Sequence, residues 1–180
     1  MKSVFAGIAA LSLSAAFAFA QSHQPYAGWQ ARPIKALSEQ QQADLKAGRG
    51  MGLALTAELN GYPGPLHAIE LSQQLELDAQ QRAAMQRLFE QMKTEAIALG
   101  ETLMAQEAEL DLLFRNRVVT PERLAAATAA IGATQGELRN IHLKYHLSTA
   151  SLLSEGQMHR YAELRGYSGG KGPEHHRPRH

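Results

Sequence analysis

The residues best suited to chemistry in this chain are two histidines, His142 and His146, that lie four positions apart. If this segment is helical, both imidazoles project from the same face of the helix. Two imidazoles at this spacing can bind Zn²⁺, Ni²⁺ or Cu²⁺, but they do not complete a metal site by themselves. The best further donors are His67 and Glu70, which would lie one turn apart on another helix.

A purely structural role for the two helix histidines is the alternative. Measured from Leu138, His142 lies roughly 40° and His146 roughly 80° around the helix at about 100° per residue, so both flank its apolar stripe. Histidines at such a boundary are commonly half-exposed and hydrogen-bond to their neighbours. Both interpretations stay open on the sequence alone.

Three further histidines, His175, His176 and His180, lie in the C-terminal residues 168–180. This tail has few apolar residues and several Gly and Pro, so we expect it to be disordered. Such a His-rich tract could bind a metal loosely, or it could be a solvated end without a specific ligand.

No group of residues suits catalysis. The chain has no Cys, so it has neither a thiol nucleophile nor a disulfide. We find no nucleophile elbow, no phosphate-binding Gly loop and no His-Glu-x-x-His motif. The 18 Lys and Arg nearly balance the 17 Asp and Glu, which does not favour a nucleic-acid partner. The sequence therefore predicts a binding protein that requires no cofactor, and not an enzyme.

Two long helices are predicted to position these residues. Residues 78–117 are built from good helix formers and carry apolar side chains at three- and four-residue steps, with Met85 and Met92 on the stripe. Thr120 and Pro121 suit the start of a second helix. In that helix an apolar residue recurs at heptad spacing: Leu124, Ile131, Leu138, Tyr145 and Leu152. The two stripes are best covered if the helices fold back as an antiparallel hairpin.

Short helices are predicted on both sides of this hairpin. Ser38, Asp78 and Ser154 each precede a Gln at the third position after them, the arrangement of a capping box. The Ala-rich first half of the second long helix contains Gly132, where another backbone could approach closely. Alternating patterns typical of strands are missing from the sequence. The predicted fold class is therefore all-α, a long antiparallel helical hairpin with short flanking helices.

One domain is predicted between a leader and the tail. Lys2 and the apolar residues 4–20 have the pattern of a secretory signal peptide, so we expect residues 1–20 to be cleaved on export. An uncleaved membrane anchor is the alternative, but the run is short for a span. Residues 21–35 are expected to be a flexible lead-in, and residues 36–167 the helical domain.

Two of the capping segments share a longer pattern. Residues 77–81 read Leu-Asp-Ala-Gln-Gln, and residues 153–157 read Leu-Ser-Glu-Gly-Gln. They resemble the Leu-Thr-x-x-Gln (LTXXQ) signature of the Spy/CpxP family of periplasmic proteins, with Asp and Ser, both good helix caps, in place of Thr. Four further segments, together with the histidine pair, are similar to the heavy-metal-sensor branch of that family: residues 48–51, 60–67, 135–139 and 161–167.

The resemblance implies a periplasmic protein that forms a cradle-shaped homodimer. Members act as ATP-independent chaperones that bind unfolded or misfolded envelope proteins in the envelope stress response. Others are metal-responsive partners of membrane signalling proteins. For this chain the resemblance therefore implies a chaperone. The alternative is a periplasmic heavy-metal sensor or metal-binding protein that uses the helix and tail histidines.

Overall fold

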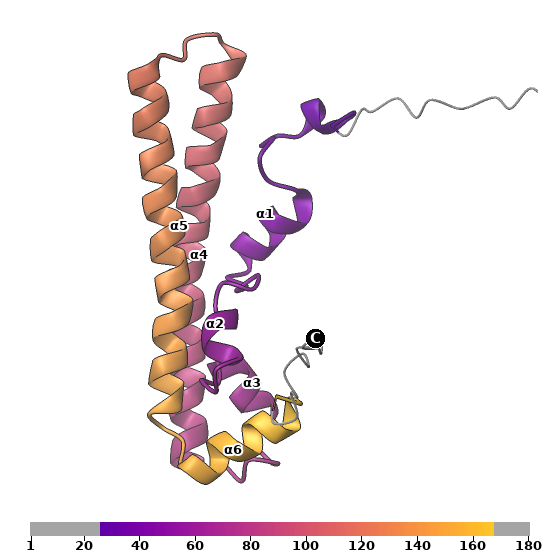
Figure 1. Cartoon of the computed structure of the whole chain (residues 1–180), viewed down its shortest axis with the longest axis vertical. Helices are drawn as coiled ribbons and strands as arrows, with labels where there is room; N and C mark the ends of the chain where they lie inside the picture. Colours follow the sequence, from indigo (N-terminus) through magenta and orange to yellow (C-terminus); the bar gives the residue numbers. More distant parts are fainter. Residues whose placement is uncertain (1–25, 168–180) are drawn as a thin grey trace, which may run out of the picture.

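The computed structural model describes residues 26–167, and every regular element in this part of the chain is helical. Figure 1 shows two long antiparallel helices, α4 (Ala79–Arg115) and α5 (Pro121–Ala150). The shorter elements lie beside them: η1 (Trp29–Ala31), α1 (Glu39–Lys46), α2 (Leu55–Glu58), α3 (Pro65–Glu70) and α6 (Glu155–Leu164). The predicted all-α hairpin with short flanking helices is thus confirmed. None of the described helices combines the length and hydropathy needed to cross a bilayer.

Several expectations fall outside the described residues. These are the signal peptide of residues 1–20, the first part of the lead-in, and the tail of residues 168–180 with its three histidines. The described end of the lead-in is packed against the hairpin. Ile34 is buried in a core shared with α4, and Lys35 Nζ lies 2.9 Å from a carboxylate oxygen of Asp111.

The predicted helix starts are confirmed. At Ser38, Asp78 and Ser154 the side chain accepts a hydrogen bond from the backbone N–H three residues later, and the Gln there accepts one from the cap residue's N–H. Thr120 caps α5 in the same way without a Gln partner, and Pro121 occupies the first helical position. These bonds satisfy donors that the first turn of a helix leaves unpaired.

The two Leu-x-x-x-Gln segments meet at the base of the hairpin. The amides of Gln81 and Gln157 bond to each other reciprocally, at 2.9 and 3.0 Å. Gln81 also donates to the Leu152 carbonyl, and Gln157 donates to the Leu75 carbonyl. The glutamines of the two segments therefore tie the start of α4 to the start of α6.

Most of the two apolar stripes is buried in two clusters, but Leu124 is 37% exposed and Leu152 lies beyond the end of α5. The first packs the α1 region against the middle of the hairpin and contains Ile34, Leu37, Leu45, Ala96, Leu103, Met104, Ile131 and Leu138. The second lies at the base of the hairpin and contains Ala68, Leu75, Leu77, Met85, Leu153 and Tyr161. Met85 and Met92 are both buried, as predicted. The segment before α4 thus packs over apolar side chains that would be exposed if the two long helices were alone.

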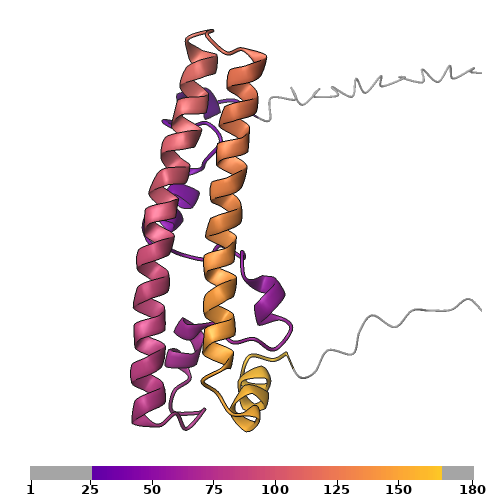
Figure 2. The same cartoon turned by 90° about the vertical axis from the view of Figure 1, so that its left-hand side faces the viewer.

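The hairpin is thinly packed toward its loop. Between Met104 in α4 and Ile131 in α5, no residue is buried. Figure 2 shows that the loop between the two helices lies at the opposite end of the molecule from α6. The packed part of the described chain is therefore the base and middle of the hairpin.

A close backbone contact occurs at Gly100 and not at Gly132. A Cβ on Gly100 would lie 2.7 Å from the carbonyl oxygen of Leu45, at the end of α1, whereas a Cβ on Gly132 would meet nothing within 4 Å. The close approach expected at Gly132 is therefore wrong, because the short helix α1 packs on α4 and leaves this part of α5 exposed.

The two glycines give a matched pair of substitutions. Gly100→Ala is expected to lower the free energy of unfolding by about 1–3 kcal/mol, because the new methyl group would collide with a backbone carbonyl. Gly132→Ala is expected to raise it by about 0.5–1 kcal/mol, because Ala is the better helix former and has open space there. Denaturant unfolding followed by circular dichroism measures both, and a similar change at the two positions would contradict the described packing of α1.

Candidate functional site

His142 and His146 are buried beneath residues 47–66, from the end of α1 to the start of α3, which we call the covering segment. Only 3% of His142 and 8% of His146 is exposed, so neither is the half-exposed boundary residue that periodicity indicated. A Cβ on Gly50 would lie 3.4 Å from His142 Nδ1, and a Cβ on Gly64 would lie 2.8 Å from His146 Nε2. At Gly50 a Cβ would be in ordinary contact with His142, whereas at Gly64 only a residue without a Cβ lets the chain approach the His146 imidazole this closely.

The His142 imidazole is neutral at pH 7 and has a nitrogen without a partner. Burial lowers the pKa of His142, and the neighbouring His146 lowers it further. Its Nε2 is buried and makes no hydrogen bond to the described residues. In the tautomer that carries the proton on Nδ1, the Nε2 lone pair is free to accept a hydrogen bond or to bind a metal.

One ring nitrogen of His146 makes a hydrogen bond, and the other faces the covering segment. Its Nδ1 lies 2.6 Å from the carbonyl oxygen of Tyr62. Because a carbonyl only accepts, Nδ1 donates and carries the proton. In the neutral ring this assignment places the lone pair on Nε2, the nitrogen that faces Gly64. The same Nδ1 lies 3.7 Å from Glu58 Oε2.

Glu58 is a buried carboxylate that the sequence analysis did not single out. Its Oε1 accepts hydrogen bonds from the Tyr161 hydroxyl at 2.5 Å and the Tyr167 hydroxyl at 3.1 Å, and lies 3.4 Å from Arg165 Nε. Burial and the bond to Glu58 raise the pKa of Tyr161, so its hydroxyl stays protonated and donates. The other oxygen, Oε2, is buried without a hydrogen-bond partner. These contacts tie α2 to α6 and the residues after it.

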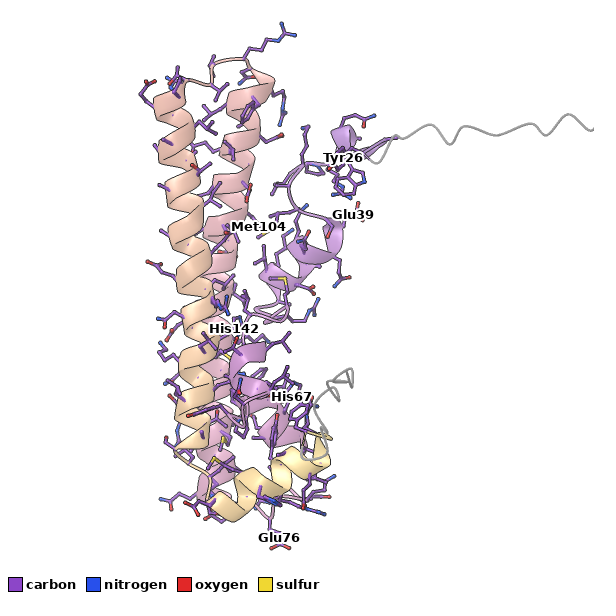
Figure 3. All side chains as sticks on the ribbon, viewed as in Figure 1. Tyr26, Glu39, His67, Glu76, Met104 and His142 are labelled. Carbon is purple, nitrogen blue, oxygen red and sulfur yellow. The ribbon has the colours of Figure 1, made fainter. Side chains whose placement is uncertain are left out.

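The two histidines and Glu58 line one pocket of about 260 Å³. The same pocket is also lined by three exposed apolar side chains: Met51, Leu55 and Leu66. His67 also lines the pocket, and its Nδ1 lies 3.0 Å from Glu70 Oε2. Figure 3 labels His67 on α3 and His142 on α5. The structure therefore brings three of the predicted histidines to one pocket, with Glu70 bonded to one of them.

The pocket does not form a complete metal site in this conformation. Within residues 26–167, no group of three His, Cys, Asp or Glu side chains is placed to hold an ion. Of the buried polar side-chain atoms without a hydrogen-bond partner, two belong to residues that line this pocket, His142 Nε2 and Glu58 Oε2. The described part of the chain therefore provides atoms that a metal could satisfy, without the full set of ligands in position.

The chain matches no known protein-family model, no characterised protein and no solved structure. The class of protein is therefore described from the fold and the candidate site of the chain itself. It is an all-helical hairpin whose covering segment closes a pocket over two buried histidines.

Proposed function

We propose that this chain is a periplasmic, Spy/CpxP-like, ATP-independent chaperone that binds unfolded or misfolded envelope proteins. The observation that supports this proposal is a set of exposed apolar side chains on the covering segment. Five of them, between 39% and 58% exposed, form what we call the 51–66 patch: Met51, Leu55, Leu59, Tyr62 and Leu66. Exposed apolar side chains gathered in one segment are typical of binding surfaces.

The 51–66 patch continues into an apolar groove. Met51 lines both the histidine pocket and a neighbouring groove of about 490 Å³ between the α1 region and α5. The groove is lined on its apolar side by Leu37, Leu45, Leu53, Leu103 and Leu138. An extended chain lying over this surface could place apolar side chains against the patch and the groove in turn.

The groove also offers polar contacts for the backbone of an unfolded chain. Gln41, Gln135 and Arg139 line it beside the apolar residues. Amide and guanidinium groups can bond to backbone carbonyls of any sequence. Met51 is flexible and polarisable, so it adapts to side chains of different shape. This mixture suits weak binding to many different clients.

A homodimer is part of the proposal. It rests on the resemblance to the Spy/CpxP family, which implies a cradle-shaped dimer.

Removing apolar groups from the 51–66 patch tests the chaperone proposal. The double substitution Leu55→Ser with Leu59→Ser is expected to raise the amount of protein needed to suppress aggregation of a denatured client roughly tenfold, because two apolar contacts are lost. The assay is light scattering without ATP. The matched control is Leu147→Ser on α5, which is 59% exposed but lines neither the pocket nor the groove. Equal loss in the control, or none in the double variant, would contradict the proposal.

Metal sensing is the second candidate function, and a specific observation favours it. His142 Nε2 and Glu58 Oε2 are buried without partners in the pocket that also contains His146 and His67. Imidazole nitrogen and carboxylate oxygen suit Zn²⁺, Ni²⁺ and Cu²⁺. A metal-dependent change in the covering segment could then be detected by a membrane signalling protein, the partner that the family resemblance suggests.

Calorimetric titration with Zn²⁺, Ni²⁺ and Cu²⁺ distinguishes the pocket from the tail. If the pocket binds metal, His142→Gln and Glu58→Gln should each weaken binding at least about tenfold, the loss that even an outer-shell partner can cause. A chain that ends at Tyr167 lacks His175, His176 and His180 and should retain this binding. If the binding heat is lost in the truncated chain but not in the two substituted chains, the metal binds to the tail, and the pocket proposal is contradicted.

A further inference from the structure

The end of the hairpin exposes large apolar side chains far from the histidine pocket. We call residues 112–124 the tip. It carries four such side chains, between 37% and 54% exposed: Leu112, Phe114, Val118 and Leu124. Figures 1 and 2 both show the tip at one end of the long axis, with α6 at the other. The tip therefore lies at the opposite end of the hairpin from the pocket near α6.

The tip is also positively charged. Its charged residues are three arginines and one glutamate: Arg115, Arg117, Arg123 and Glu122. Asp111, just before the tip, is shared between Arg115 and Lys35 and so does not cancel this excess. Arg117 makes no ion pair and no side-chain hydrogen bond within the described residues. Apolar and cationic side chains thus occur together on a convex end.

Arg117 holds a backbone conformation that favours glycine. Its φ is 55°, in the left-handed region, at the position where α4 ends. Arg117 N–H donates to the Phe114 carbonyl and Val118 N–H donates to the Leu113 carbonyl, both at 3.0 Å, as in a Schellman motif. Glycine is the usual residue at this position because a Cβ is strained there. Arg117 is exposed at this position, so its side chain is accessible to a partner.

We propose that the tip binds an anionic lipid surface. Phe114 and Val118 would enter the headgroup region, while the guanidinium groups of Arg117 and Arg123 contact lipid phosphates. Apolar side chains flanked by cationic ones are typical of segments that bind at the membrane interface. A folded protein partner would need a cavity shaped for this narrow end, whereas a lipid surface needs only to be flat, deformable and negatively charged. This inference is independent of the proposed chaperone and metal functions.

A fluorescent probe at the tip tests the proposal in the full chain. Trp29 is the only tryptophan, so Trp29→Phe with Phe114→Trp gives a single reporter at residue 114. Its emission should shift to the blue with vesicles of phosphatidylglycerol and phosphatidylcholine, and not with phosphatidylcholine alone. In the same background Arg117→Gly should raise the half-maximal lipid concentration about fivefold, since one cationic contact is lost. Arg117→Lys should leave it nearly unchanged.

The design separates a lost membrane contact from a lost fold. Arg117→Gly relaxes a left-handed position, so it should unfold at the same or a higher temperature than the parent. Arg87→Gln, on an exposed part of α4 near the base, is the charge-matched control and should not change the response. Equal shifts with both vesicle types, no shift with either, or equal responses of Arg117→Gly and Arg117→Lys would overturn the proposal. A concentration-dependent shift without lipid would also overturn it, because the tip would then meet a second copy of the chain.

Discussion

A buried carboxylate holds together parts of the chain that are 103 residues apart. Glu58 in α2 accepts hydrogen bonds from Tyr161 in α6 and from Tyr167 beyond it. A carboxylate without such partners is costly to bury, so the docked α6 stabilises the covering segment over α5. That segment buries His142 and His146. The contacts of Glu58 therefore help to hold the histidine pocket closed, together with the bond from His146 to the Tyr62 carbonyl.

The described chain divides into three parts along the hairpin. At the base, the paired glutamines and the Glu58 contacts join α4, α6 and α2. In the middle, α1 packs against α4 at Gly100 and leaves an apolar groove beside α5. At the far end the hairpin carries exposed apolar and cationic side chains and no buried ones. The buried side chains are thus concentrated in the base and middle of the hairpin, where the pocket lies. The far end is exposed, so a partner can reach it.

Local sequence signals predicted the helices well, because each signal acts within a few residues. The caps at Ser38, Asp78 and Ser154 and the long stripes of α4 and α5 are of this kind. His67 and Glu70 lie one turn apart on a helix, as expected, and the structure in addition brings their side chains within bonding distance of each other.

The features that the sequence did not predict depend on contacts between segments that are far apart in the chain. The burial of His142 follows from cover that begins near Gly50, 92 positions earlier by residue number. Glu58 lies in a helix of 4 residues, too short for periodicity to indicate a buried face, and its partners follow more than a hundred residues later. The sequence alone could not show that another backbone approaches Gly100 and not Gly132, because this depends on where α1 packs.

A double-mutant cycle between Glu58→Gln and Tyr161→Phe, measured by denaturant unfolding of the full chain, tests the central claim most directly. The account predicts that each single change lowers the free energy of unfolding by about 1–3 kcal/mol, because a buried polar group is left unpaired. It also predicts that the double change costs less than the sum, with a coupling of about 1 kcal/mol or more. Strictly additive effects would contradict a structural role for this bond.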